Sequence, residues 1–72
     1  MKVLITGGAG YIGSVITYAF LDRGHKVVII DKACSADEFN ILGCYFYHGD
    51  FSDKKLLEQV FSEHNDIELI IH

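Results

Sequence analysis

The fold of this chain is decided by residues 5–13, which read Ile-Thr-Gly-Gly-Ala-Gly-Tyr-Ile-Gly. An apolar run, Val3–Ile5, leads directly into this stretch, and a run with helical spacing of apolar residues begins at Ile12. A strand, a glycine turn and a helix therefore follow one another with no spare residues. This arrangement is typical of a turn that binds the phosphates of a nucleotide.

The three glycines of the G-x-x-G-x-x-G spacing have different physical roles. Gly7 allows the chain to turn sharply as it leaves the strand. Gly10 allows backbone N–H groups to approach a pyrophosphate closely, and Gly13 allows the helix to pack tightly on the strand. The helix N-terminus adds unpaired N–H donors and the positive end of the helix dipole. The stretch therefore predicts a dinucleotide site.

The rest of the chain alternates apolar strands with amphipathic helices. We expect strands at 2–6, 26–31, 44–48 and 67–71, helices at 11–23 and after Ser52 or Asp53, and a loop at 33–40. In the second helix, Leu56, Leu57, Val60 and Phe61 are predicted to be buried. The order predicts an α/β fold, the N-terminal half of a Rossmann (doubly wound parallel) fold, with about four strands and helices on both faces.

Asp31 is the second informative residue. It ends the second strand roughly twenty residues beyond the glycine turn, where a dinucleotide-binding fold places the acid that accepts the ribose hydroxyls. A carboxylate also repels a 2′-phosphate, so the position favours NAD over NADP. Lys32 follows immediately and partly offsets that repulsion.

Composition excludes several classes of function. The chain has 72 residues, half of them hydrophobic, and a net charge of −4, so it offers no basic surface for nucleic acid. No stretch approaches the roughly 18 apolar residues of a membrane span, and no secretory signal is present, so we expect a cytoplasmic protein. Cys34 and Cys44 are expected to be free thiols, and with His48 and His64 they match no zinc spacing.

Two other interpretations of the motifs are weaker. A P-loop needs a lysine after its second glycine, and Ser14 stands at that position after Gly13. The four histidines, His25, His48, His64 and His72, fall at the ends of expected helices and strands. Since none of them belongs to a readable catalytic motif, we interpret them as structural.

The opening Met1–Ser14 resembles that of the extended short-chain dehydrogenases/reductases, within the NAD-dependent epimerase/dehydratase family. It is most similar to the N-terminal part of the UDP-glucose 4-epimerases, whose signature includes T-G-G-x-G-Y-I-G-S. Gly49-Asp50 and the final Ile70–His72 also match the family pattern. The resemblance implies a partial NAD-binding Rossmann domain over 1–72, without the C-terminal half and the substrate domain.

The resemblance also implies roles for individual residues. Tyr11 and Ile12 would lie against the pyrophosphate through their backbone. Asp31 and residues 32–36 would line the adenosine ribose, and Asp50 and Phe51 would flank the adenine, with the acid accepting from its amine. The chain departs from the family at Val15, usually histidine, and at Lys32, usually asparagine.

The family's reaction moves a hydride from the sugar C4 to NAD and back, and it requires a catalytic tyrosine with a lysine four residues later. No such pair occurs in this chain, so no catalytic residue is predicted. Two functions stay open. One is an NAD-binding part of a sugar-nucleotide epimerase that binds a UDP-sugar only when complemented by the missing part. The other is a non-catalytic NAD-binding or sensor module, or a remnant of another NAD-dependent sugar-nucleotide dehydratase. We also expect the fourth strand to be an exposed edge through which the chain self-associates.

Overall fold

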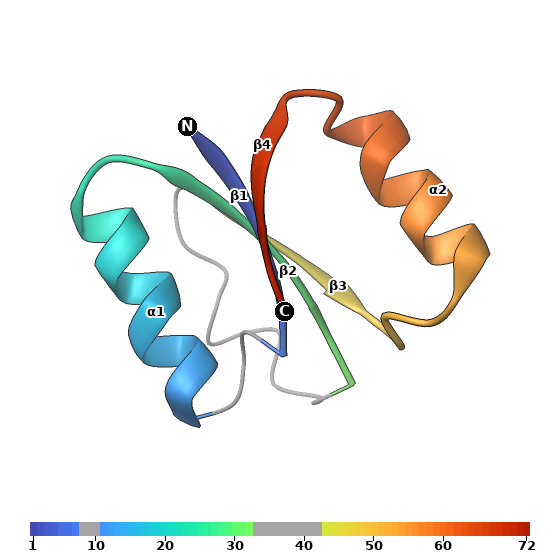
Figure 1. Cartoon of the computed structure of the whole chain (residues 1–72), viewed down its shortest axis with the longest axis horizontal. Coiled ribbons are helices and arrows are strands. Elements are labelled where there is room, and N and C mark those ends of the chain that lie inside the picture. Colours follow the sequence, from blue (N-terminus) through green and yellow to red (C-terminus); the bar gives the residue numbers. More distant parts are fainter. Residues whose placement is uncertain (8–10, 33–42) are drawn as a thin grey trace.

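The computed structural model describes residues 1–7, 11–32 and 43–72. In this part of the chain the elements are β1 (Lys2–Thr6), α1 (Tyr11–Asp22), β2 (Lys26–Asp31), β3 (Cys44–His48), α2 (Lys54–Glu63) and β4 (Ile67–Ile71). The strands form one parallel sheet in the order β3-β2-β1-β4 (Figure 1). The predicted α/β fold is confirmed, with the strand order of the N-terminal half of a doubly wound sheet. The loop predicted at 33–40 lies outside the described residues.

The two helices cover opposite faces of the sheet (Figure 1). Successive strand residues point to opposite faces, so each central strand contributes to two separate cores. The core beneath α1 contains Val3, Ile5, Val27 and Ile29, with Ile16, Phe20 and Leu21 packed on it. The core beneath α2 contains Leu4, Val28, Ile30 and Val60, with Leu56 and Leu57 packed on it. Helices on both faces are therefore confirmed.

The predicted helix ends are nearly right. α1 ends at Asp22, one residue before the predicted end, and Gly24 follows with a φ of 83° and donates its N–H to the Leu21 carbonyl. This left-handed conformation is the usual glycine cap of a helix C-terminus. Asp53, one of the two predicted caps, accepts from the backbone N–H of Lys55 at 3.0 Å and of Leu56 at 3.3 Å at the start of α2.

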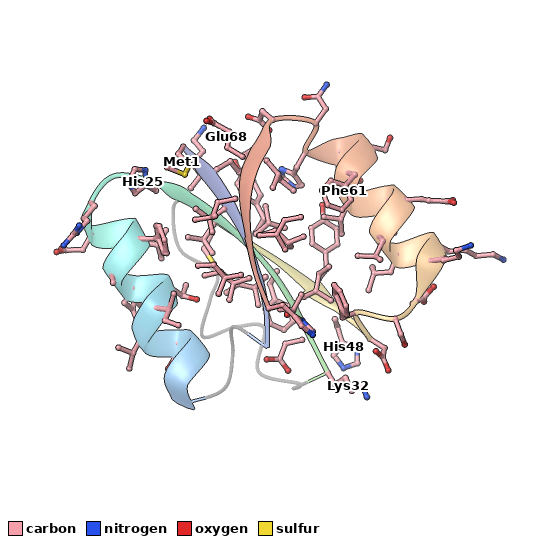
Figure 2. All side chains as sticks on the ribbon, viewed as in Figure 1. Met1, His25, Lys32, His48, Phe61 and Glu68 are labelled. Carbon is pink, nitrogen blue, oxygen red and sulfur yellow. The ribbon has the colours of Figure 1, made fainter. Side chains whose placement is uncertain are left out.

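The prediction that Phe61 is buried is wrong. Phe61, which Figure 2 labels at α2, is 40% exposed. Val60 beside it in the sequence is completely buried. α2 presents a narrow stripe to the sheet, and Phe61 lies about 100° around the helix from Val60, at the margin of that stripe. In the described part of the chain no further element covers this margin.

A polar network joins the C-terminal end of α2 to the sheet. His64, only 7% exposed, is its centre. The Lys2 ammonium lies 3.0 Å from His64 Nδ1 and 2.9 Å from an Asp66 carboxylate oxygen. His64 Nε2 lies 3.0 Å from the Tyr47 hydroxyl, which donates to Glu63 at 2.6 Å. Because an ammonium has no acceptor and a carboxylate no donor, these bonds require a neutral His64 that accepts at Nδ1 and donates from Nε2.

The same network shifts two pKa values. Burial, followed by the charge of Lys2, lowers the pKa of His64 below its ordinary value, against the opposing influence of Asp66 and Glu63. Burial and the neighbouring Glu63 raise the pKa of Tyr47 to about 12. Both shifts favour the uncharged side chain. The contacts at the junction between α2 and the sheet therefore require His64 and Tyr47 to be uncharged, as they are at neutral pH.

We predict that acid weakens this junction through His64. Since its pKa is lower in the folded state than in the unfolded chain, the unfolded state binds the proton more readily as pH falls below about 6.5. The free energy of unfolding should therefore decrease from pH 7 toward pH 5. Urea unfolding monitored by circular dichroism would measure the decrease. His64→Gln, whose amide still donates and accepts, should show a smaller one.

The matched control for this prediction is His25→Gln, which removes an imidazole outside the network, at the N-terminal ammonium of Met1. It should retain the acid dependence of the unchanged chain. An identical pH profile for His64→Gln and the unchanged chain would contradict the prediction.

β4 forms one edge of the sheet, because it pairs only with β1 among the described strands. Two of its apolar side chains are exposed, Leu69 at 39% and Ile70 at 52%. An exposed apolar edge offers unpaired backbone N–H and C=O groups to another strand. This geometry matches the edge expected from the sequence.

We predict that the chain self-associates through β4. Sedimentation velocity should show a mean mass that rises with concentration. Ile70→Lys should move this rise to about tenfold higher concentration, a change of about 1.4 kcal/mol, since an edge lysine opposes strand pairing. Val15→Lys, at a position 61% exposed on α1, is the matched control and should change nothing. A monomer at every concentration would refute the prediction.

Candidate functional site

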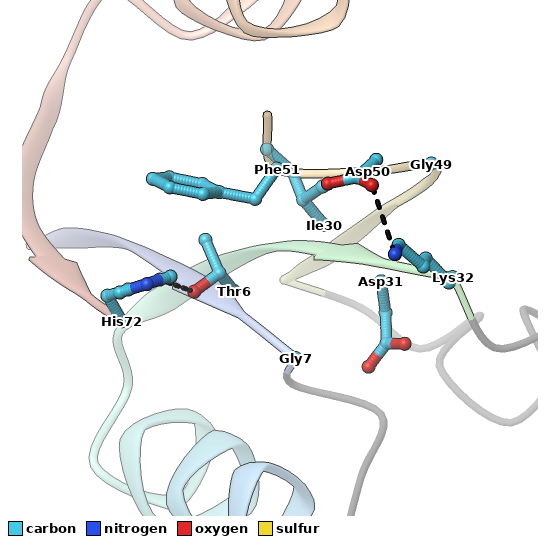
Figure 3. Close-up of a pocket in the computed structure, with 9 residues that line it drawn as sticks. All are labelled: Thr6, Gly7, Ile30, Asp31, Lys32, Gly49, Asp50, Phe51 and His72. Atoms are coloured by element: carbon cyan, nitrogen blue, oxygen red, sulfur yellow. Dashed lines mark hydrogen bonds and ion pairs between the residues drawn. The ribbon is translucent and has the colours of Figure 1, made fainter. Parts of the chain in front are cut away.

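A pocket of about 340 Å³ lies at the carboxyl end of the sheet (Figure 3). It is lined by Thr6, Gly7, Ile30, Asp31, Lys32, Gly49, Asp50, Phe51 and His72. These residues come from the ends of β1, β2 and β4 and from the turn after β3. In open parallel sheets, ligands bind at the carboxyl ends of the strands, where the chain passes from each strand into the following loop.

The pocket brings together five of the nine residues that the sequence proposes for cofactor binding: Gly7, Asp31, Lys32, Asp50 and Phe51. Gly13 lies in the first turns of α1, where its carbonyl accepts a 2.8 Å hydrogen bond from the buried Thr17 hydroxyl. Gly10 lies outside the described residues. Tyr11 and Ile12 begin α1, and of these two only the backbone is described.

Gly7 makes the turn that the sequence requires of it. Its φ is +71°, in the left-handed region that glycine adopts without strain. Its N–H donates to the Ile30 carbonyl at 2.8 Å, so the turn is fastened to the end of the neighbouring strand. This bond places Gly7 beside the end of β2, where Asp31 follows Ile30.

Asp31 and Lys32 leave the end of β2 in opposite directions. Val27 and Ile29 face α1, and Asp31 continues this series. Figure 3 shows its carboxylate pointing to the side of the sheet where α1 lies, while the Lys32 ammonium points to Asp50. The carbonyl of Asp31 accepts from the Gly49 N–H at 2.9 Å, which ties the ends of β2 and β3 together.

Asp50 is held by three donors. One carboxylate oxygen, Oδ1, accepts from both the backbone N–H and the hydroxyl of Ser52, each at 2.9 Å. The other, Oδ2, lies 3.0 Å from the Lys32 ammonium. These bonds lower the pKa of Asp50 to about 2, the Ser52 backbone contributing first. A carboxylate oxygen accepts two hydrogen bonds, so Oδ2 has room for one further donor.

The structure also assigns pocket positions to Thr6 and His72, which the sequence left out of the site. Thr6 Oγ1 and His72 Nδ1 share a 2.7 Å hydrogen bond between the ends of β1 and β4. The His72 ring lies against the Phe51 ring, with centroids 4.5 Å apart and planes 30° from parallel. Together they form a flat aromatic wall. The position of His72 at the end of a strand beside β1 is the signal that could have found it.

Other classes of site are not supported in the part of the chain that the structure describes. No group of three potential metal ligands occurs there. No helix among residues 11–32 and 43–72 is long and apolar enough to cross a membrane. The free thiol of Cys44 is half-buried between the sheet and α1, and burial raises its pKa, which disfavours the thiolate that a reactive cysteine requires.

The chain is similar to known proteins over its whole length. The model of the NAD dependent epimerase/dehydratase family matches residues 3–72. A UDP-glucose 4-epimerase from Halalkalibacterium halodurans is 39% identical over 72 residues, which are all of this chain and 21% of the relative. One from Neisseria meningitidis serogroup B is 40% identical and matches 99% of this chain, 23% of the relative.

A solved structure extends the similarity to three dimensions. The UDP-glucose 4-epimerase of Bifidobacterium longum, in complex with NAD+ and UDP, superposes with a TM-score of 0.86 at 31% identity. The match covers all of this chain and 24% of that protein. The chain thus spans about a fifth to a quarter of the length of these relatives, and it belongs to the NAD dependent epimerase/dehydratase family.

Proposed function

We propose that this chain binds the adenosine diphosphate half of NAD in the pocket at the carboxyl end of the sheet. The observation that carries the proposal is that one pocket is lined by Gly7 at the start of the glycine motif, by Asp31 and by Asp50 and Phe51 of the turn after β3. These groups come from three different strand ends and are separated by up to 44 positions in the sequence. They have the chemistry that a phosphate, a ribose and a base each require.

The pyrophosphate would bind the glycine motif, with Gly7, Gly13 and the backbone of Tyr11 and Ile12 as its contacts. Gly10, which the sequence predicts for the same role, lies outside the described residues. The start of α1 contributes its N–H groups and its dipole to the phosphate charges. Asp31 points to the side of the sheet that α1 covers (Figure 3), and there its carboxylate would accept from the ribose hydroxyls next to the phosphates.

The adenine then lies near Asp50 and Phe51. The Phe51 ring, supported by His72, offers a flat apolar surface to the base. The remaining acceptor position on Asp50 Oδ2 suits the exocyclic amine, which shares this oxygen with Lys32. Lys32 therefore stands at the rim of the base site and neutralises the acid there.

We further propose that the chain supplies this half-site to sugar-nucleotide epimerisation at C4, and that it is inactive alone. NAD would supply the hydride acceptor for that reaction. The sequence lacks a tyrosine with a lysine four residues later, so the proton transfer at the sugar needs another polypeptide segment. A UDP-sugar would bind only in the complemented protein. The similarity to UDP-glucose 4-epimerases favours this reaction over the alternative of a non-catalytic NAD-binding module.

We predict saturable binding of NAD to the purified chain, measured by isothermal titration calorimetry. Asp31→Ala should weaken it at least tenfold, about 1.4 kcal/mol, because two ribose hydrogen bonds are lost. Asp22→Ala, which removes an exposed acid at the far end of α1, is the matched control and should bind like the unchanged chain. Circular dichroism would verify that each variant is folded. A folded chain that does not bind NAD would exclude the proposed function.

Complementation tests the role in catalysis. We predict that co-expression with the C-terminal four-fifths of the Halalkalibacterium halodurans relative yields interconversion of UDP-glucose and UDP-galactose, whereas the chain alone yields none. Asp31→Ala should reduce the complemented activity. NAD binding without any complemented activity would favour the non-catalytic module instead.

A further inference from the structure

Lys32 stands where the family resemblance expects asparagine, directly after the acid assigned to the ribose. A cation at this position could offset the repulsion between Asp31 and a 2′-phosphate and so admit NADP. The structure bears on this question, because it shows where the charge of Lys32 goes. The ammonium lies 3.0 Å from Asp50 Oδ2, on the other side of β2 from the Asp31 carboxylate (Figure 3).

The direction of Lys32 follows from strand alternation. Val28 and Ile30 face α2, and Lys32, two positions further, continues that series toward the turn after β3. Asp31 continues the opposite series toward α1. The sheet therefore separates the two charges by direction even though they are adjacent in sequence.

Asp50 is a fixed partner. Its other oxygen is held by the N–H and hydroxyl of Ser52, so the carboxylate is oriented before it meets the lysine. The Lys32 side chain is 74% exposed and is not held by packing. A lysine is a charged group on a flexible four-carbon stem, so strand direction sets where the side chain starts but does not fix its ammonium, and the ion pair with Asp50 holds the ammonium away from the ribose side.

We propose that Lys32 is a specificity-determining residue whose pairing with Asp50 preserves the preference for NAD over NADP. This inference rests on the proposed function. Asp50 holds the positive charge of Lys32 on the base side, so this ammonium does not offset the repulsion between Asp31 and a 2′-phosphate. Without Asp50 as its partner, the ammonium can turn to the ribose side and attract a 2′-phosphate.

The experiment measures the affinities of the full 72-residue chain for NAD and for NADP by calorimetric titration and compares their ratio. Asp50→Asn should shift the ratio toward NADP by about tenfold at low salt. The asparagine oxygen still accepts from Ser52, so the turn is kept. The ratio cancels any loss that both dinucleotides share at the adenine. The shift should shrink at 1 M salt, where the Debye length is about 3 Å.

Two further variants test whether the shift in the affinity ratio depends on Lys32. Lys32→Met should leave the ratio in favour of NAD, and the double variant Asp50→Asn with Lys32→Met should lose the tenfold shift. Asp53→Asn is the matched control. It removes one nearby carboxylate but keeps the Lys32–Asp50 pair, and asparagine caps a helix about as well as aspartate.

The outcomes separate the two levels of the proposal. An unchanged ratio in Asp50→Asn, an equal shift in Asp53→Asn, or a shift that persists in the double variant would overturn the role of Lys32 and leave NAD binding intact. Absence of NAD binding in the unsubstituted chain would overturn the proposed function and this inference together.

Discussion

The burial of β1 and β2 on both faces is the constraint on which the rest of the structure depends. Val3, Leu4, Ile5 and the four residues Val27–Ile30 are at most 1% exposed. Two adjacent parallel strands that are apolar throughout need a cover on each side, and a parallel connection must cross the sheet to return. α1 and α2 meet both requirements at once. The same constraint brings the carboxyl ends of β1, β2 and β4 to one edge, which is why a pocket forms there.

Alternation along these strands also decides the chemistry of the two ends of the sheet. At the carboxyl end of β2 it directs Asp31 to the side of the sheet where α1 lies and Lys32 toward Asp50 (Figure 3). Near the amino end of β1 it sends Lys2 to the side of α2, where the ammonium meets the neutral His64. The charged groups of the pocket are exposed enough to meet a ligand, whereas those of the α2 junction mostly satisfy one another. The alternation of side chains along the strands therefore places the charged groups of the pocket at the carboxyl end of the sheet and those that join α2 to the sheet at its amino end.

The sequence predicted the elements because their signals are local. The apolar runs and the cap at Asp53 depend on neighbouring residues, and both appear in the structure as strands and as the start of α2. Of the glycine motif, Gly7 has the expected left-handed φ. Asp31 could be placed because the end of a strand is a local property. The bond between Thr6 and His72 joins residues 66 positions apart, and the bond between Lys2 and His64 joins residues 62 positions apart. Neither bond could be predicted from a pattern of neighbouring residues in the sequence.

The exposure of Phe61, like the contacts Thr6–His72 and Lys2–His64, depends on how distant parts of the chain pack together. Helical spacing identifies which residues can face a sheet, but the width of the buried stripe depends on how many neighbouring elements cover the helix. A family model cannot supply that width either, because this chain spans only about a fifth of the relatives' length. The pairing of Lys32 with Asp50 was likewise hidden, since it depends on the register of β2 with β3, in which Asp31 pairs with His48.

The small size of the sheet links cofactor binding to folding. A chain of this length buries a modest fraction of its surface, and its free energy of folding starts close to zero. A ligand that contacts the ends of β1 and β2 and the turn after β3 binds only when these segments are assembled. At a hundredfold excess over its dissociation constant, such a ligand adds about 2.7 kcal/mol to the stability of the folded chain. If NAD occupies the pocket as proposed, it therefore also stabilises the fold. It contacts several strand ends at once, in a small sheet whose edge strand β4 has no further strand beside it among the described residues.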